Sequence, residues 1–181
     1  GAGLFAASSL LLVRPVIGTL VLLAAFFLVL ERFRRDGRAR YLLALPVLQL
    51  TWANFQGLSA LGPFMVGAYA LGAYADWARA RRLLITLGCC LGALCLTPFG
   101  LRGAALPVVL LGRLLPGQQQ IFAQQVAENL PPFELERLSG GELWHFKWCL
   151  LLLGVSVLVA GRRLLLSHAL LLLGFAGLSL M

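Results

Sequence analysis

The chain has 181 residues, of which 60% are hydrophobic and 12% are charged, and its mean hydropathy is +0.90. These values lie outside the range of ordinary soluble domains, so we expect an integral membrane protein. The net charge is +8, but the Arg residues lie between long apolar runs and not on a solvated face, which argues against a nucleic-acid binder. The cysteines also lie within apolar runs and lack metal-ligand spacing, which argues against a disulfide-stapled secreted module and against a metal site.

Long apolar runs predict membrane-spanning helices, because backbone groups in hydrocarbon must be satisfied within the segment. After Arg14 and Pro15 the runs are Val16–Leu30, Tyr41–Thr51, Leu58–Tyr74, Leu83–Leu96, Leu143–Ala160 and Leu164–Met181. Several are shorter than the roughly 20 residues that a span needs, so either flanking residues extend them or some do not cross fully. We expect an all-α, polytopic transmembrane bundle of about five to seven membrane helices, forming a single domain over residues 1–181.

The positions of the Arg residues predict how the bundle is oriented. Ten of the 15 cations lie in three short segments, Glu31–Arg40, Asp76–Arg82 and the turn at Gly161. Short cytoplasmic loops accumulate Lys and Arg, so we assign these segments to the cytoplasmic side. Residues 97–142 then form a periplasmic loop with short interfacial, amphipathic helices. The expected location is a bacterial inner membrane, crossed several times.

The segment Trp52-Ala53-Asn54-Phe55-Gln56-Gly57 is the first candidate site, at the predicted non-cytoplasmic face. Amides donate and accept hydrogen bonds, the indole donates, and glycine permits close backbone approach, so Trp52, Asn54, Gln56 and Gly57 suit a sugar or a lipid headgroup. The alternative is an interfacial hairpin turn in which Trp52 anchors the helix and Asn54 caps it.

Arg14 is the second candidate, because its guanidinium at the edge of an apolar run suits a phosphate. The alternative is that it extends to the lipid headgroups without binding a ligand. In the loop over 97–142, the spacing of Ile121, Gln124, Gln125 and Glu128 gives one polar helical face, which either closes over a headgroup or is simply solvated. Glu142 and His145 are weak acid-base candidates without a third metal ligand. We expect His168, within the last apolar run, to be a satisfied interior residue, and we expect no cofactor.

The order of these motifs resembles bacterial polytopic proteins related to the GT-C glycosyltransferases. Their middle region runs from Arg-Pro through a basic loop to Trp-x-Asn-x-His-Gly, then to Asn-Pro-Tyr-Gly and a Pro-Pro loop. This chain has Arg14-Pro15, Trp52 to Gly57, Thr97-Pro98-Phe99-Gly100 and Glu128 to Phe133 in that order. Gln56 replaces the His of the pattern, and the acidic loop that the family uses for catalysis does not occur in these residues. The catalytic residue therefore stays unknown.

The resemblance implies a segment of a longer membrane glycosyltransferase that transfers a sugar from a polyprenyl-phosphate donor at the periplasmic face. The substrate-binding residues would be Arg14, Trp52, Asn54, Gln56, Gly57 and Glu128, and the partners a lipid bilayer and the polyprenyl-phosphate sugar. The alternative function is a non-catalytic structural subunit of a larger membrane complex, which includes other membrane subunits. Small residues on the apolar helices would then serve helix contacts: Gly57, Gly62, Gly67 and Gly72, spaced five apart, and Gly88 and Gly92, four apart.

Overall fold

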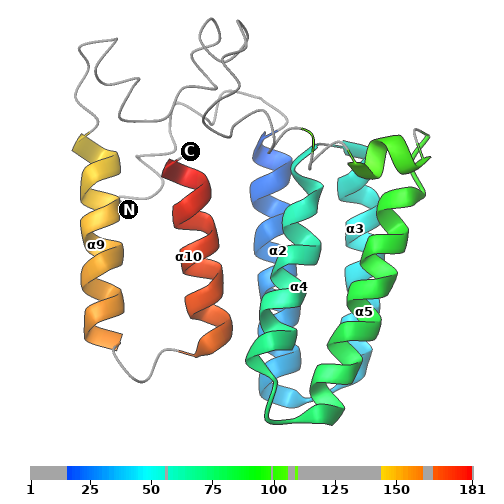
Figure 1. Cartoon of the computed structure of the whole chain (residues 1–181), viewed down its shortest axis with the longest axis horizontal. Coiled ribbons are helices and arrows are strands. Elements are labelled where there is room, and N and C mark those ends of the chain that lie inside the picture. Colours follow the sequence, from blue (N-terminus) through cyan, green and yellow to red (C-terminus); the bar gives the residue numbers. More distant parts are fainter. Residues whose placement is uncertain are drawn as a thin grey trace, which may run out of the picture.

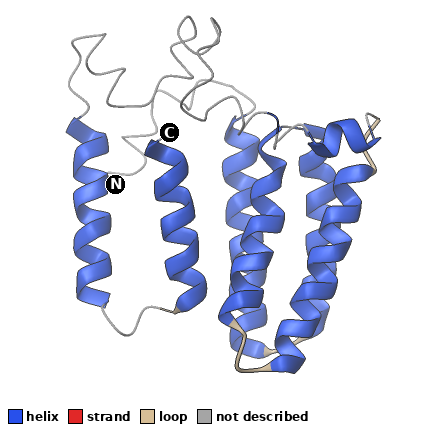
Figure 2. Cartoon of the chain, in the orientation of Figure 1, coloured by secondary structure: helices blue, strands red, loops and turns tan. Residues whose placement is uncertain are grey.

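The computed structural model describes residues 16–55, 57–98, 100–105, 109, 144–160 and 165–180. Across these ranges the regular structure is entirely helical (Figure 2), so the all-α prediction is confirmed for them. The elements are α2 (Val16–Asp36), η2 (Ala39–Leu43), α3 (Ala44–Phe55), η3 (Gly57–Ala60), α4 (Leu61–Gly72), α5 (Trp77–Cys95), α9 (Trp144–Ala160) and α10 (Leu166–Leu180).

Helices α2, α3, α4 and α5 form an antiparallel group of four, with α10 packed on α4 and α9 on the far side of α10 (Figure 1). The turns from α2 to α3 and from α4 to α5 lie at the same end of this group. We call it the Arg end and define it by residues 31–43 and 73–82. The turn from α3 to α4, which follows Asn54 and Phe55 at the end of α3, lies at the opposite end.

The chain reversals at the Arg end have local causes. Gly37 follows α2 with φ +67° and donates its N–H to the carbonyl of Phe33 at 2.8 Å, which ends the helix in the way that favours glycine. The Asp76 carboxylate accepts the N–H of Arg79 at 3.1 Å and caps the start of α5. Because α2 ends just before Gly37 and α5 begins after Asp76, the Arg residues of these two helices lie side by side at the Arg end.

Large side chains from α2, α3 and α4 fill the core of the bundle. Phe26, Leu30, Leu45, Trp52 and Val66 are fully buried. The rings of Phe26 and Trp52 meet edge to face with centroids 5.6 Å apart, an arrangement that contributes about 0.5–1.5 kcal/mol beyond area burial. Trp52 therefore holds α3 against α2.

Glycines set the approach of two helices to α4. A Cβ on Gly72 would meet Ser167 of α10, and a Cβ on Gly174 of α10 would meet the ring of Phe64. A Cβ on Gly62 would likewise meet the side chains of Gln49 and Phe26. Gly67, Gly88 and Gly92, by contrast, would have open space around a Cβ. Only part of the glycine pattern in the sequence therefore serves helix contacts within the described residues.

The structure contradicts the predicted polytopic transmembrane bundle. Among the residues described, none of the helices combines the length and the apolar character that crossing a bilayer requires. Helices α3 and α4 have 12 residues each and α10 has 15, which at 1.5 Å per residue falls short of roughly 30 Å of hydrocarbon. The longer α2 contains Glu31, Arg32 and Arg34, and α5 contains Arg79, Arg81 and Arg82.

The predicted multi-pass location in a bacterial inner membrane is contradicted by the same finding. The apolar runs suggest whole spans, whereas α2 and α5 extend beyond their runs into charged residues, and α3, α4 and α10 are short. The predicted loop over 97–142 lies mostly outside the described residues.

Replacing Gly62 with alanine tests the close packing of α3 and α4. The added methyl group would press on Gln49 and Phe26 in the core, so we expect Gly62→Ala to destabilise the protein by about 1–3 kcal/mol. Gly67→Ala in the same helix is the control, because a Cβ on Gly67 meets open space. This substitution should stabilise the protein by about 0.5–1 kcal/mol. Chemical denaturation measures both, and equal effects of the two changes would contradict this packing.

Candidate functional site

Trp52 and Asn54, two residues of the sequence-predicted site, have their polar groups engaged within the fold. The Trp52 side chain is 0% exposed, and its Nε1 donates to Thr19 Oγ1 at 3.3 Å. Asn54 is exposed, but its Nδ2 donates to the carbonyl of Leu50, one turn earlier in α3, at 2.9 Å. The Trp52 indole therefore links α3 to α2, and the Asn54 amide bonds within α3.

The remaining residues of the predicted site are not assembled by the described structure. Gly57 begins η3, next to Asn54 at the end opposite the Arg end. Arg14, Gln56, Glu128 and Glu142 lie outside the described residues, and His145 is described only as part of the α9 backbone. The structure thus leaves the predicted headgroup site untested.

A different set of polar residues is brought together at the Arg end. We call Glu31, Arg34, Arg35, Tyr69 and His168 the polar cluster; its members come from α2, α4 and α10. The Glu31 carboxylate accepts from Arg34 Nε at 2.9 Å, from Arg35 Nε at 3.0 Å and from Tyr69 Oη at 3.2 Å. His168 Nε2 lies 3.4 Å from Glu31 Oε2 and 3.4 Å from Tyr69 Oη. One carboxylate therefore links three helices.

The charges of the polar cluster shift the pKa values of its acidic groups. Hydrogen bonds from Arg34 hold the pKa of Glu31 well below its usual range, and the Arg35 and Tyr69 hydrogen bonds act in the same direction, although burial opposes them. Burial and the neighbouring Glu31 carboxylate raise the pKa of Tyr69. At neutral pH the cluster therefore contains an ionised carboxylate and a protonated phenol.

Sequence reasoning treated Glu31 and the following Arg residues as a charged turn and missed the polar cluster. The spacing of Glu31 to Arg34 and Arg35, three and four residues apart, does indicate an ion pair on one helical face. Tyr69 and His168 are isolated polar residues in apolar runs, and their sequence distance from Glu31 hides the contact. His168, expected to be a satisfied interior residue, has polar partners in Glu31 and Tyr69, but its side chain is 27% exposed.

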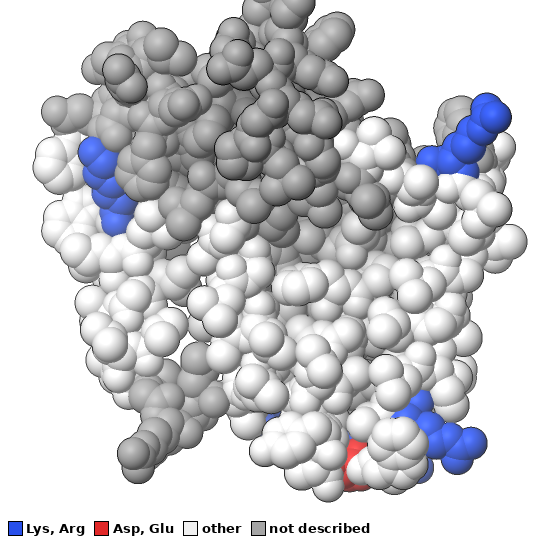
Figure 3. Space-filling model, viewed as in Figure 1, with Lys and Arg blue, Asp and Glu red and all other residues white. Residues whose placement is uncertain are grey.

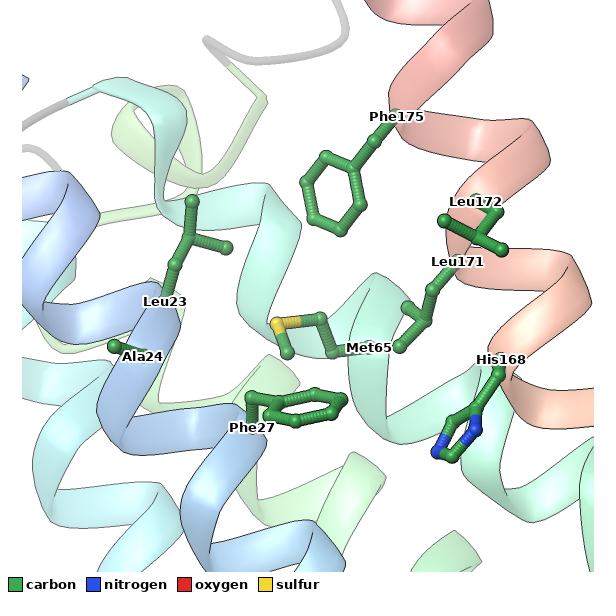
Figure 4. Close-up of a pocket in the computed structure, with 8 residues that line it drawn as sticks. All are labelled: Leu23, Ala24, Phe27, Met65, His168, Leu171, Leu172 and Phe175. Atoms are coloured by element: carbon green, nitrogen blue, oxygen red, sulfur yellow. The ribbon is translucent and has the colours of Figure 1, made fainter. Parts of the chain in front are cut away.

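An apolar pocket of about 580 Å³ opens beside the polar cluster, between α2, α4 and α10 (Figure 4). Met65 and Leu171 are buried in its wall, whereas Phe27 is 42% exposed at its edge. His168 supplies the single polar side chain among the lining residues, which are Leu23, Ala24, Phe27, Met65, His168, Leu171, Leu172 and Phe175. We call this the apolar pocket.

A smaller pocket of about 230 Å³ is lined by Tyr69, whose Oη contacts His168 of the apolar pocket. Its polar lining consists of Arg34, Tyr69, Asp76, Arg79 and Ser167, and we call it the Arg pocket. Arg79 is fixed there, because its Nε lies 3.1 Å from Asp76 Oδ2 and its Nη1 donates to the carbonyl of Arg34 at 3.4 Å. The two pockets thus differ sharply in polarity.

The described residues offer binding groups more readily than catalytic ones. Among them, no group of three or more His, Cys, Asp or Glu side chains is placed to hold a metal ion. Burial raises the pKa of the Cys90 thiol to about 12, so this thiol is protonated and a poor nucleophile at neutral pH. His168 at the edge of an apolar pocket is suited to orienting a ligand.

Comparisons with known protein families, with characterised proteins and with solved structures found no match to this chain. The resemblance to the GT-C glycosyltransferases therefore has no support beyond the order of its motifs, and sugar transfer stays a prediction.

The lowered pKa of Glu31 predicts a pH-dependent stability. The unfolded chain binds a proton at Glu31 near its ordinary pKa of about 4.5, whereas the folded chain does so only at lower pH. The contribution of Glu31 to the free energy of unfolding is therefore complete at pH values above the unfolded pKa. It is lost as the pH falls towards the folded pKa. Glu31→Gln should destabilise by about 1–3 kcal/mol at neutral pH and flatten the acid limb of the stability profile.

Denaturant titrations across the acid range measure this contribution. Asp36→Asn is the matched control at the same end, because the Asp36 carboxylate is exposed and accepts only from Tyr41 Oη at 3.0 Å among the hydrogen bonds described. An acid limb that is unchanged by Glu31→Gln, or equally changed by both substitutions, would argue against the polar cluster.

Proposed function

We propose that this chain binds the hydrocarbon chain of an amphiphilic molecule in the apolar pocket between α2, α4 and α10. The observation that carries the proposal is the combination of a volume of about 580 Å³ with a lining in which His168 is the one polar side chain. Ligand sites have volumes of roughly 300–1,000 Å³, are lined mainly by apolar and aromatic groups, and contain a few polar groups that fix orientation.

The position of the lining residues favours an elongated ligand. His168 and Phe175 lie seven residues apart on α10, which corresponds to about 10 Å along the helix axis. Figure 4 shows His168 and Phe27 at one end of the pocket and Phe175 at the other, with Met65 between them. A hydrocarbon chain running along α10 would contact each of these side chains and bring its polar end to His168.

This proposal shares a lipid-type ligand with the sugar-transfer hypothesis but places it elsewhere. The resemblance implied a site around Trp52 and Asn54, whereas the apolar pocket adjoins the Arg end. A polyprenyl-phosphate sugar stays one predicted partner, and binding in the apolar pocket does not require that this chain catalyse a transfer.

Filling the pocket tests the proposal. Ala24 is exposed on α2 and lines the pocket, so Ala24→Phe should occupy the space without disturbing the core. We expect saturable binding of dodecanol to the purified chain by calorimetry, weakened at least about tenfold in Ala24→Phe because the added ring removes the volume available to the chain. The matched control is Ala44→Phe, at an exposed alanine of α3 outside the pocket. Equal binding by the two variants would refute the site.

A second candidate function is a structural subunit of a larger complex, which the surface of α9 favours. Leu158 and Val159 of α9 are 82% and 81% exposed, and Trp148, Leu151 and Leu152 are also exposed. Large contiguous apolar surfaces usually mark contacts with a partner.

Purification of the full chain from its native source tests this second function. We expect further subunits to co-purify in stoichiometric amounts, and Leu158→Gln to reduce their recovery because it removes an exposed apolar contact. The control Leu43→Gln changes a residue that is 75% exposed on η2, away from α9. A monodisperse single polypeptide would count against the structural role.

A further inference from the structure

We propose that the amphiphile carries an anionic head group, held in the Arg pocket while its hydrocarbon chain lies in the apolar pocket. This inference rests on the proposed function, because it assigns the polar half of the same ligand. Phosphate and carboxylate heads share the chemistry that the Arg pocket recognises.

Consecutive residues of α10 line the two pockets. Ser167 lines the Arg pocket, and the next residue, His168, lines the apolar pocket. Tyr69 lines the Arg pocket, and its Oη lies 3.4 Å from Nε2 of His168, which lines the apolar pocket; this distance exceeds that of a well-formed hydrogen bond. The junction between head and chain would lie against this pair, whose polar atoms suit the ester oxygen of a phosphate head or an oxygen of a carboxylate.

The Arg pocket has donors suited to an anion. A guanidinium carries five N–H donors, so Arg79 can keep its contacts with Asp76 and with the Arg34 carbonyl and still bind an oxyanion. Arg34 lines the same pocket while its Nε is bound to Glu31. The buried Ser167 hydroxyl provides a third group that can donate.

The charge around the Arg pocket selects for an anion over a cation. Residues 31–40 and 76–82 contain eight Arg residues against three carboxylates, Glu31, Asp36 and Asp76, which gives a net charge of +5. Figure 3 shows cationic side chains gathered beside a carboxylate at this lower end of the bundle, a mostly uncharged surface across the middle, and further cationic side chains at the upper left and upper right. A positive field of this kind attracts an anionic head and repels a cationic one.

Three probes of equal chain length test the head group: dodecanol, dodecanoate and dodecyl phosphate, each titrated into the purified full chain. We expect at least one anion to bind about tenfold or more tightly than dodecanol, because charge-assisted hydrogen bonds exceed neutral ones. The anion with the larger advantage identifies the head as carboxylate or phosphate.

Arg79→Gln should remove most of that advantage, and circular dichroism with thermal unfolding checks that the variant is folded. Arg81→Gln is the matched control, because it removes the same charge from the same helix outside both pockets. Equal affinity of the wild-type chain for the anions and dodecanol would overturn the anionic head while leaving the proposed function intact. An equal loss in both Arg variants would overturn the Arg pocket. Absence of dodecanol binding would instead refute the proposed function.

Discussion

The carboxylate of Glu31 is the interaction on which the arrangement at the Arg end depends. It accepts hydrogen bonds from Arg34 and Arg35 of its own helix and from Tyr69 of α4, and it lies within 3.4 Å of His168 of α10. Its side chain is only 12% exposed, so an unpaired charge there would be costly. The two cations and the phenol compensate that cost, and this compensation fixes α2, α4 and α10 relative to one another.

The close approach of α10 to α4 explains why the apolar pocket exists beside this anchor. Gly72 admits Ser167, and Gly174 admits the ring of Phe64, so α10 contacts α4 at both of these levels. Helix α2 contacts α10 through the polar cluster at the Arg end. The space between these contacts is bordered by Phe27, Met65 and Leu171, which leave a volume of about 580 Å³. The pocket therefore follows from where the three helices touch.

A ligand with a hydrocarbon chain and an anionic head matches both the pocket and the charge of the Arg end. The sugar-transfer hypothesis needs ligand-facing groups around Asn54 and Trp52, yet Trp52 packs against Phe26 in the core. Aromatic residues next to amides in a sequence suggest a binding surface, but the same residues equally suit a buried contact between helices. The Trp52 indole is buried against Phe26, and only the folded chain shows that contact.

The sequence alone determined the all-α class of the described residues and placed reversals within Glu31–Arg40 and Asp76–Arg82, because apolar runs separated by charged residues are visible over a few neighbouring positions. It did not determine how long each helix is: the runs that suggested membrane spans became helices that are short or charged at one end. The polar cluster and both pockets were decided by tertiary structure. Glu31, Tyr69 and His168 lie far apart in the chain, and their meeting depends on the glycine contacts that bring α10 onto α4, which no local pattern encodes.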